Sequence, residues 1–546
     1  MAGSLCFVSS GEFRNNQVHE DKSVRLKSDR LLRFGLLLVA AAALALRGPQ
    51  LDRRPLHNDE AVNAVKLQSL WEKGGYVYDP NEFHGPTLHY AALPFLWLSS
   101  DRNFDHVSET TLRLAPVCCG VALILLLWLI GDALGRAATL WAGLLAAFSP
   151  AMVFYSRYFI HEMLLVSFTM VVLVAAWRYT RTRHPGWAVL AGAGLGLMHA
   201  TKETFVIAVG AMGLAALLTA AWNRWRDQKT WTIQSYWNFN HALAALLAAA
   251  AVSIVLFTSF FTNPSGPLDS VRSYLPWLSR AGGNSPHIHP WYFYLERLAY
   301  FHQGKGPIGS EGLILALAGV GLIAAFVRKE LADANVTWVR FIAFYTLIMT
   351  GAYSVISYKT PWCLLGFLHG MILLAGVGTV VLVRMCASRT SRIGVRAVLL
   401  VAAGQLAWQA WRGSYLYCAD GRNPYVYAQT VPDILQLVQK VEALSKIHPQ
   451  GHQMLLQVMA PESEYWPLPW YLRQFKRVGW WDRVPVDPYA PAMIVGSKFN
   501  AALDDKSNKA WLMVGLFELR PQVFFELYVQ FDLWRQYVES LPRERE

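Results

Sequence analysis

The chain has 546 residues, of which 54% are hydrophobic and 16% are charged, with a net charge of +12. Soluble domains have about 45–50% apolar and about 25% charged residues, so this composition and a mean hydropathy of +0.26 exclude a purely soluble or disordered chain. The sequence has no basic run with interleaved aromatic residues, the pattern that would predict nucleic-acid binding. Its six cysteines lack the paired spacing of a disulfide framework or zinc cluster.

The hydropathy pattern predicts a polytopic α-helical membrane protein. A span needs about 20 mostly apolar residues, and the first apolar stretch begins near Leu31, after a polar segment of mixed charge that is unlike a secretory signal. The segment 88–99 is apolar but short, and Pro94 interrupts it, so we assign it to a juxtamembrane helix. About eleven spans are predicted, at residues 31–47, 114–131, 137–154, 161–178, 186–200, 204–222, 241–261, 312–327, 339–357, 362–384 and 395–411.

The basic residues predict the orientation. Loops on one side hold clusters of arginine and lysine, near residues 178–183, 224–229, 328–340 and 384–396, and the short loops on the other side hold one basic residue each. Because basic loops stay in the cytoplasm, residues 1–30 are predicted to be cytoplasmic. The two long loops, 48–113 and 262–311, are predicted to lie outside the cell membrane.

The composition changes after the transmembrane domain, which is predicted over residues 31–412. Residues 413–546 alternate short β-like runs with amphipathic stretches, which predicts a small α/β domain on the outer face. The runs are at 454–459, 493–495 and 511–517, and the amphipathic stretches are at 434–444 and 521–538.

Ionisable side chains gather in the loop after the first span. Asn58 is predicted to cap a helix whose first turn carries Asp59 and Glu60. The helical repeat places four side chains on one face: Asp59, Val62, Asn63 and Lys66. Acids in a first turn can merely complement the helix dipole. The alternative is a catalytic role, which His57 and the polar segment 84–90 favour for Asp59.

A second acid, Glu162, opens the fourth predicted span beside His161 and five residues after Arg157. An interfacial salt bridge between Arg157 and Glu162 would explain an acid here, and so would a site in which Glu162 meets Asp59. Both interpretations stay open. Two carboxylates in one cavity could bind a divalent cation or divide the roles of general base and charge stabiliser.

Two lysines stand at span ends on the same predicted face: Lys202 in HATKETF, and Lys359 after Tyr358 in SYKTPW. A lysine at a span end commonly extends its ammonium group to the headgroups. An ammonium group is also a point-charge ligand for phosphate. Either lysine is therefore a candidate contact for a phosphate-bearing lipid.

Two further segments combine aromatic residues with possible ligands. In the second outer loop a glycine pair precedes His287, His289 and an aromatic run, which suits either a lid with a metal-capable histidine pair or an aromatic belt at the interface. The candidate metal ligands are Asp59, Glu162, His287 and His289. In the tail, three aromatic residues beside two prolines could stack on sugars or dock the domain on a membrane: Trp466, Trp470 and Tyr471.

The motifs with most information, in chain order, are HNDEAVNA (57–64), YDPNEFHGPTLHY (78–90), RLAPVCCGV (113–121), SRYFIHEMLL (156–165), GLMHATKET (196–204), SYKTPW (357–362) and YWPLPWYLR (465–473). This order resembles the GT-C superfamily of membrane glycosyltransferases, in the branch of the protein O-mannosyltransferases and lipid A aminoarabinose transferases. Within it, the chain most resembles the bacterial and archaeal flippase activity-associated family. The resemblance covers most of the chain, strongly over 50–210 and weakly over 220–310.

The resemblance implies roles for single residues. It makes Asp59 the catalytic base, followed by Glu60 as in the Asp-Glu pair of the mannosyltransferases, and it makes Glu162 the second acid, where relatives often have Asp. Lys202 matches a lysine that contacts the donor phosphate. His84 stands where aminoarabinose-type relatives carry a Lys-Pro-Pro-like element, and is the candidate replacement. The other predicted substrate contacts are Arg157, His161, Tyr358 and Lys359.

The implied activity is inverting transfer of a hexose or pentose from a polyprenyl-phosphate-linked sugar to a hydroxyl group of a lipid, glycan or protein acceptor at the outer leaflet. The expected partners are membrane lipids, this lipid-linked co-substrate and the acceptor, and the candidate cofactor is a divalent metal cation. The rival is a non-catalytic accessory of lipid-carrier translocation, or a transporter, of the same fold. A transporter places its ionisable residues near the bilayer midplane, whereas here they cluster at one face, which favours an enzyme.

Overall fold

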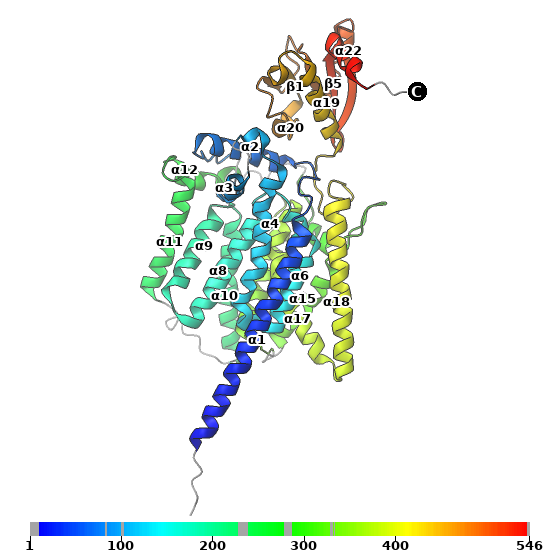
Figure 1. Ribbon diagram of the computed structural model, residues 1–546. Coiled ribbons are helices and arrows are strands. Elements are labelled where there is room, and N and C mark those ends of the chain that lie inside the picture. Colours follow the sequence, from blue (N-terminus) through cyan, green and yellow to red (C-terminus); the bar gives the residue numbers. More distant parts are fainter. Residues whose placement is uncertain are drawn as a thin grey trace, which may run out of the picture.

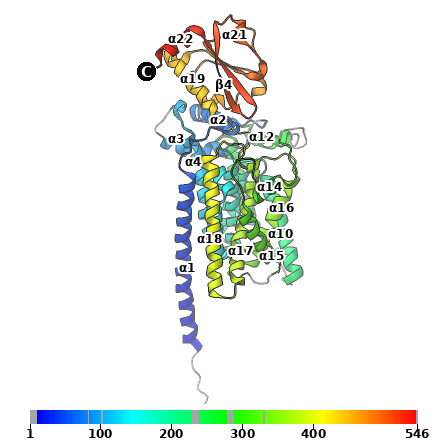
Figure 2. The same ribbon diagram turned by 90° about the vertical axis from the view of Figure 1, so that its right-hand side faces the viewer.

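The computed structural model describes residues 10–81, 84–99, 103–227, 238–277, 287–327, 331 and 333–542, with side chains from residue 29 onward. The chain forms a bundle of long helices with a small α/β domain at one end (Figure 1). The N-terminal part of α1 (Ser10–Arg47) projects beyond the opposite end (Figure 2). We call the end of the bundle that lies under the C-terminal domain the loop end.

Each predicted span falls on helices of the bundle. Its remaining long helices are α4 (Glu109–Leu126), α6 (Arg136–Phe148), α8 (Glu162–Thr182), α9 (Pro185–His199), α10 (Phe205–Asp227), α11 (Phe239–Phe257), α15 (Gly312–Val327), α16 (Val336–Val355), α17 (Leu365–Met385) and α18 (Arg389–Trp411). Among the described residues, seven helical segments are long and apolar enough to cross a membrane, and two more apolar helices are shorter. The chain is a multi-pass membrane protein, and the count of eleven spans stays a prediction.

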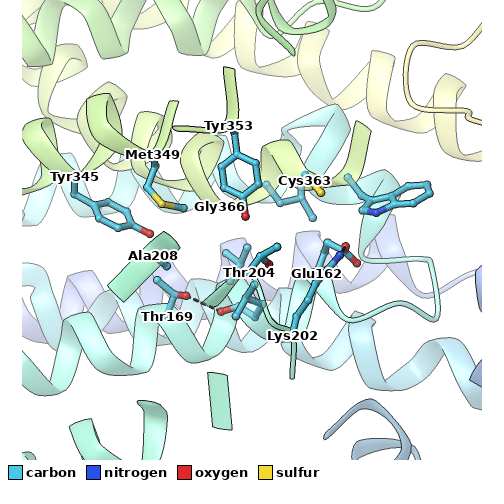
Figure 3. A pocket seen from close by; sticks show the side chains of 14 residues that line it. Glu162, Thr169, Lys202, Thr204, Ala208, Tyr345, Met349, Tyr353, Cys363 and Gly366 are labelled. Carbon is cyan, nitrogen blue, oxygen red and sulfur yellow. Dashed lines mark hydrogen bonds and ion pairs between the residues drawn. The ribbon is translucent and has the colours of Figure 1, made fainter. Parts of the chain in front are cut away.

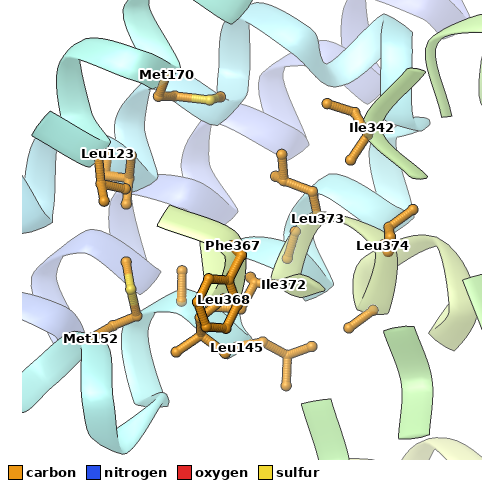
Figure 4. Close-up of a cluster of buried hydrophobic side chains, with 14 of the residues drawn as sticks. Leu123, Leu145, Met152, Met170, Ile342, Phe367, Leu368, Ile372, Leu373 and Leu374 are labelled. Atoms are coloured by element: carbon orange, nitrogen blue, oxygen red, sulfur yellow. The ribbon is translucent and has the colours of Figure 1, made fainter. Parts of the chain in front are cut away.

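Small residues let the central helices approach closely. A Cβ atom at Gly321 of α15 would lie 2.1 Å from the carbonyl oxygen of Leu374 in α17, and one at Gly378 would lie 1.9 Å from that of Leu317. Such contacts give van der Waals packing that side chains would prevent. Around them lies a cluster of large buried side chains contributed by several helices, among them Leu145, Met170 and Phe367 (Figure 4).

The first long loop folds into two helices at the loop end, α2 (Asn58–Lys73) and α3 (Thr87–Leu98) (Figure 1). The helix α3 is the short apolar segment that we assigned to a juxtamembrane position. The N-cap of α2 is His57, not Asn58 as predicted, because the His57 ring accepts a hydrogen bond from the Asp59 backbone N–H and Glu60 completes a capping box.

A buried ion cluster fixes the start of α2. The Glu60 carboxylate is fully buried and pairs with Arg54 at 3.0 Å and Arg113 at 2.7 Å. It also accepts the backbone N–H groups of His57 and Phe159, at 2.9 and 2.8 Å. Burial alone would raise the pKa of Glu60, but the two guanidinium charges and these hydrogen bonds lower it to about 2.

The second long loop contains the short helices α12 (Gly266–Arg272) and α14 (Phe293–Ala299). An isolated bridge pairs Ile288 with Tyr358, and the Lys359 N–H donates to the His287 carbonyl at 2.8 Å. The loop is thereby attached to the segment that enters α17. The glycine pair of the predicted lid lies outside the described residues.

The C-terminal domain is a five-stranded mixed sheet with helices packed on it. Its strand order is β2-β1-β3-β5-β4, with β1 parallel to β2 and β3, and β5 antiparallel to β3 and β4. The strands are β1 (Leu456–Met459), β2 (Val478–Trp481), β3 (Ala492–Gly496), β4 (Trp511–Arg520) and β5 (Val523–Gln530), and the helices are α19 (Asp433–Ile447), α20 (Leu468–Tyr471), α21 (Leu503–Lys506) and α22 (Phe531–Ser540).

The sequence pattern located most of this domain and was wrong in one segment. Three predicted runs became β1, β3 and β4, the stretch 434–444 became α19, and strand β2 was not predicted. The stretch 521–538 is not one amphipathic segment, because its first half is strand β5. There Phe525, Leu527 and Val529 are fully buried at every second position, which is the repeat of a strand and not of a helix.

We predict that Glu60→Gln lowers the free energy of unfolding by about 3–5 kcal/mol, because it leaves two buried guanidinium groups without their shared carboxylate. Glu72→Gln on the exposed part of α2 is the matched control and should change it by less than about 0.5 kcal/mol. Since the pKa of Glu60 is depressed in the folded state, its contribution is present above the ordinary carboxyl pKa and is lost as the pH falls toward about 2. Denaturant unfolding of the purified protein measures both variants, and equal stability would contradict the role of the cluster.

Candidate functional site

A cavity of about 560 Å³ lies at the loop end, between the first long loop, the ends of the central helices and the C-terminal domain. This volume is in the range of ligand pockets, about 300–1,000 Å³. Its lining residues are Asn58, Asp59, Val62, Asn63, Val65, Lys66, Ser69, Pro80, Asn81, His84, Ile160, His161, Glu162, Lys202, Trp277, Tyr358, Trp362, Ser463 and Trp466.

The cavity brings together side chains that the sequence could only name separately. Both Asp59 and Glu162 line it, together with four more of the predicted site residues: His84, His161, Lys202 and Tyr358. The predicted face of α2 is confirmed, because all four of its members line the same cavity. The catalytic and binding roles of these residues stay predictions.

The Asp59 carboxylate is accessible, with 47% of its side chain exposed, and it lies 3.9 Å from His57 Nδ1. The same nitrogen accepts the Asp59 backbone N–H at 3.1 Å, and His57 Nε2 lies 3.0 Å from the Tyr427 carbonyl oxygen. These contacts assign the proton to Nε2 and leave the ring neutral. The contact between His57 and Asp59 is therefore a cap that orients Asp59, and not an ion pair.

Glu162 and Lys202 form a buried ion pair on the cavity wall. Glu162 is the first residue of α8, and Lys202 lies in the turn between α9 and α10. Both also line a narrow cleft of about 20 Å³ that runs between α8, α10, α16 and α17, and Trp362 is the third residue common to both (Figure 3). The pair thus stands where the polar cavity meets an apolar cleft.

His84 is held in place by the residue that follows Lys202. Its Nδ1 atom lies 2.7 Å from the Glu203 carboxylate, which also accepts the Tyr78 hydroxyl at 3.2 Å. The His84 ring is stacked on Trp277, with 5.0 Å between the ring centroids. Burial alone would raise the pKa of Glu203, but the contact with His84, a backbone N–H group and the charge of Lys202 together lower it. That Glu203 orients His84 was not predicted from the sequence.

Three predicted site residues lie elsewhere. Glu60 belongs to the buried ion cluster, and its carboxylate does not line the cavity. Arg157 forms no salt bridge with Glu162. Its guanidinium group donates to the backbone carbonyls of Arg47, Pro49 and Gln50 and to the Tyr415 hydroxyl. Lys359 is buried beside the cavity, and its ammonium group donates to the Ile356 carbonyl. Each is engaged by backbone or charge partners that the sequence pattern does not show.

The histidines proposed as metal ligands make another contact. His287 Nδ1 and His289 Nε2 lie 2.7 and 3.2 Å from the Tyr427 hydroxyl oxygen. In the part of the chain that the structure describes, no group of three or more histidine, cysteine, aspartate or glutamate side chains is placed to hold a metal ion. The predicted metal site is thus unsupported.

The three tail aromatics have separate positions, and the interpretation as a sugar-stacking residue stays open for Trp466. Trp470 is fully buried against Phe104 and donates to Glu109 at 2.8 Å, and the Tyr471 hydroxyl accepts the Leu56 N–H at 2.8 Å. Both residues therefore dock the C-terminal domain on the first long loop, not on a membrane. Trp466 lines the cavity.

This arrangement defines a class of protein. A multi-pass helical bundle with a small domain at one end is also the fold of solved structures of the ArnT and oligosaccharyltransferase type. The resemblance drawn from the sequence is confirmed at this level.

The comparisons give the particular relatives. Residues 88–263 match the family model described as dolichyl-phosphate-mannose-protein mannosyltransferase. The chain is similar to ArnT from Cupriavidus metallidurans in the apo state, with a TM-score of 0.60, 15% identity, and 90% of this chain and 97% of that chain covered. For ArnT bound to undecaprenyl phosphate, the TM-score is 0.58 and the identity 14%, with the same coverage. No curated protein sequence matches the chain.

An archaeal structure shares the fold. The oligosaccharyltransferase AglB from Archaeoglobus fulgidus, in complex with an inhibitory peptide and a dolichol-phosphate, aligns with a TM-score of 0.51 and 12% identity. The alignment covers 86% of this chain and 70% of that chain. At these identities the likeness shows the fold alone.

We predict that Trp470→Ala loosens the C-terminal domain, because it removes a buried indole, which costs about 3–5 kcal/mol. Hydrogen exchange of residues 461–476 should then become faster. The matched control is Lys476→Ala, whose ion pair with Asp105 is half-exposed and contributes at most about 1 kcal/mol. Unchanged exchange in the Trp470 variant would show that the domain is held by other contacts.

Proposed function

We propose that the protein is an inverting glycosyltransferase that moves a sugar from a polyprenyl-phosphate-linked donor to a hydroxyl group at the outer leaflet. The observation that carries the proposal is the cavity in which Asp59, the Glu162–Lys202 pair and His84 meet at the mouth of an apolar cleft. The fold relatives support it, since ArnT has been solved with bound undecaprenyl phosphate and AglB with a dolichol-phosphate.

The proposed reaction is a single displacement. Asp59 takes the proton of the acceptor hydroxyl while its oxygen attacks the anomeric carbon of the donor sugar. The new oxygen–carbon bond forms on the face opposite the phosphate, and the bond from that carbon to the phosphate oxygen breaks. The polyprenyl phosphate leaves with the electron pair, and the configuration at the anomeric carbon is inverted. An exposed carboxylate at the cavity is suited to this role.

The donor phosphate is proposed to lie beside Lys202. An ammonium group has three hydrogen-bond donors, so Lys202 can keep its contact with Glu162 and still donate to phosphate oxygens. A cation fixed by a buried partner needs no reorganisation when negative charge develops on the leaving group. Glu162 then acts as a positioning residue for Lys202. Its ion-pair partner is Lys202, and not Arg157, the partner that the sequence left open.

The polyprenyl tail is proposed to enter between α8, α10, α16 and α17, along the line of the cleft. Because the cleft is about 20 Å³, room for about one water molecule, these helices must separate to admit the chain. The cleft is lined mainly by apolar side chains, among them Leu165, Val166 and Met349, and it begins at Lys202 (Figure 3). A lipid whose charged head must reach the cavity while its chain stays in hydrocarbon fits this continuity. A soluble nucleotide sugar has no hydrocarbon chain that could occupy the cleft.

We predict that Asp59→Asn lowers turnover by about 10²–10⁴-fold, the usual contribution of a general base. The assay supplies the purified full-length protein with a panel of undecaprenyl-phosphate-linked sugars and a panel of hydroxyl acceptors (saccharides, glycolipids and serine- or threonine-containing peptides), and it measures released undecaprenyl phosphate. Asp52→Asn, an exposed acid of the same loop, is the matched control and should keep wild-type turnover. Unchanged turnover in the Asp59 variant would refute the base assignment, and no release by the wild type with any donor would favour the non-catalytic lipid-carrier function.

A further inference from the structure

The C-terminal domain supplies part of the cavity lining. Ser463 and Trp466 belong to the segment between β1 and α20, and they are its only two lining residues from this domain among those described. All other lining residues come from the bundle and its long loops. A domain outside the helical bundle therefore contacts whatever occupies this space.

The segment that carries these two residues has backbone angles that its residues disfavour. Glu462 and Ser463 adopt left-handed backbone angles, with φ of 51° and 58°, which are costly for residues with a Cβ atom. The Arg520 guanidinium donates to the carbonyls of Glu464 and Trp466, each at 3.2 Å. Strained backbone that the surroundings fix in place is common where a protein grips a ligand.

Docking of the domain gives the segment a fixed position relative to Asp59. Besides the Trp470 and Tyr471 contacts, Arg473 donates to the Val107 carbonyl at 2.8 Å and Lys476 pairs with Asp105 at 2.6 Å. The first long loop that receives these contacts is the loop that carries α2 (Figure 2). Trp466 and Asp59 are therefore positioned by one connected set of contacts.

The ring contacts distinguish Trp466 from the other cavity tryptophans. Trp277 is stacked on His84, and Trp362 packs edge-on against His57 at 5.4 Å between centroids. In the described part of the chain, the ring of Trp466 neighbours that of Tyr465, with 6.5 Å between centroids and a tilt of 33°. The indole of Trp466 is half-buried. Its ring contact is thus more distant than those of the other two, and its indole also packs against the apolar cluster that contains Trp470.

The rest of the lining adds uncharged hydrogen-bonding groups. The amides of Asn58, Asn63 and Asn81 and the hydroxyls of Ser69 and Ser463 line the cavity. A sugar ring presents an apolar C–H face, which suits the negative face of an indole, and an edge of hydroxyl groups that both donate and accept hydrogen bonds. An aromatic face among amides and hydroxyls matches this chemistry.

We propose that Trp466 and Ser463 form an acceptor subsite for carbohydrate, so that the attacking hydroxyl belongs to a glycan, free or lipid-linked, and not to a polypeptide. This inference rests on the proposed function, because it assigns the acceptor of that reaction. The acceptor ring stacks on Trp466 and directs one hydroxyl group toward Asp59. The C-terminal domain then selects the acceptor, while the bundle binds the donor.

The test is binding of the full-length protein in nanodiscs to a panel of defined mono- to tetrasaccharides and serine- or threonine-containing peptides. The wild type should bind at least one saccharide. Trp466→Ala should weaken its Kd at least tenfold, Trp466→Phe by no more than about threefold because a ring remains, and Ser463→Ala by an intermediate factor. Trp481→Ala, an exposed tryptophan on β2 of the same domain, is the matched control and should bind like the wild type.

Two arms separate the sources of the glycan. The bound saccharide is presented in solution and on a lipid anchor within the nanodisc, and tighter binding of the anchored form identifies a glycolipid acceptor. Binding of peptides alone, of no panel member, or equal saccharide binding by Trp466→Ala and Trp481→Ala would overturn the subsite. Release of undecaprenyl phosphate with water as acceptor is measured in parallel. If the wild type releases undecaprenyl phosphate but binds no saccharide, the carbohydrate subsite is wrong, whereas the proposed glycosyltransferase activity still stands.

Discussion

Glu60 carries a negative charge in the interior of the loop end, where Arg54 and Arg113 hold it with two backbone N–H groups. Taking three charges out of water is costly, and the cluster persists because the carboxylate oxygens are hydrogen-bonded. Its partners lie before α2, in α4 and just before α8, so one carboxylate joins three parts of the chain. Asp59 is the preceding residue, and its direction into the cavity follows from this anchor and from the His57 cap.

Two pairs of side chains, each joined by a short polar contact, lie along the cavity wall. Lys202 is paired with Glu162, and the neighbouring Glu203 orients His84, so two adjacent residues of one turn hold partners from two other parts of the chain. Asp59 lies beside a neutral histidine instead. Preorganised groups of this kind stabilise developing charge without having to move. The geometry is therefore suited to a reaction in which a proton is taken at one point and a phosphate leaves at another.

Local patterns were enough to predict part of this site. The helical repeat of α2 places Asp59, Asn63 and Lys66 on one face, and hydropathy places Glu162 at the start of a helix. The partners of Glu60 could not be predicted, because Arg113 lies 53 residues away and only tertiary packing brings it close. The same holds for Arg157, whose carbonyl partners lie at the end of α1, and for Trp466, which reaches the cavity only because the C-terminal domain is docked. Strand β5 was missed because its alternating pattern was taken together with the helix that follows.

We propose that a bound polyprenyl phosphate places its phosphate at the junction of the cavity and the cleft. A cryo-EM structure of the full-length protein in nanodiscs with undecaprenyl phosphate tests it most directly. The proposed function predicts phosphate density within hydrogen-bonding distance of Lys202 Nζ, about 3 Å, with the chain between α8 and α16. Phosphate bound away from Lys202, with the cleft closed, would contradict it.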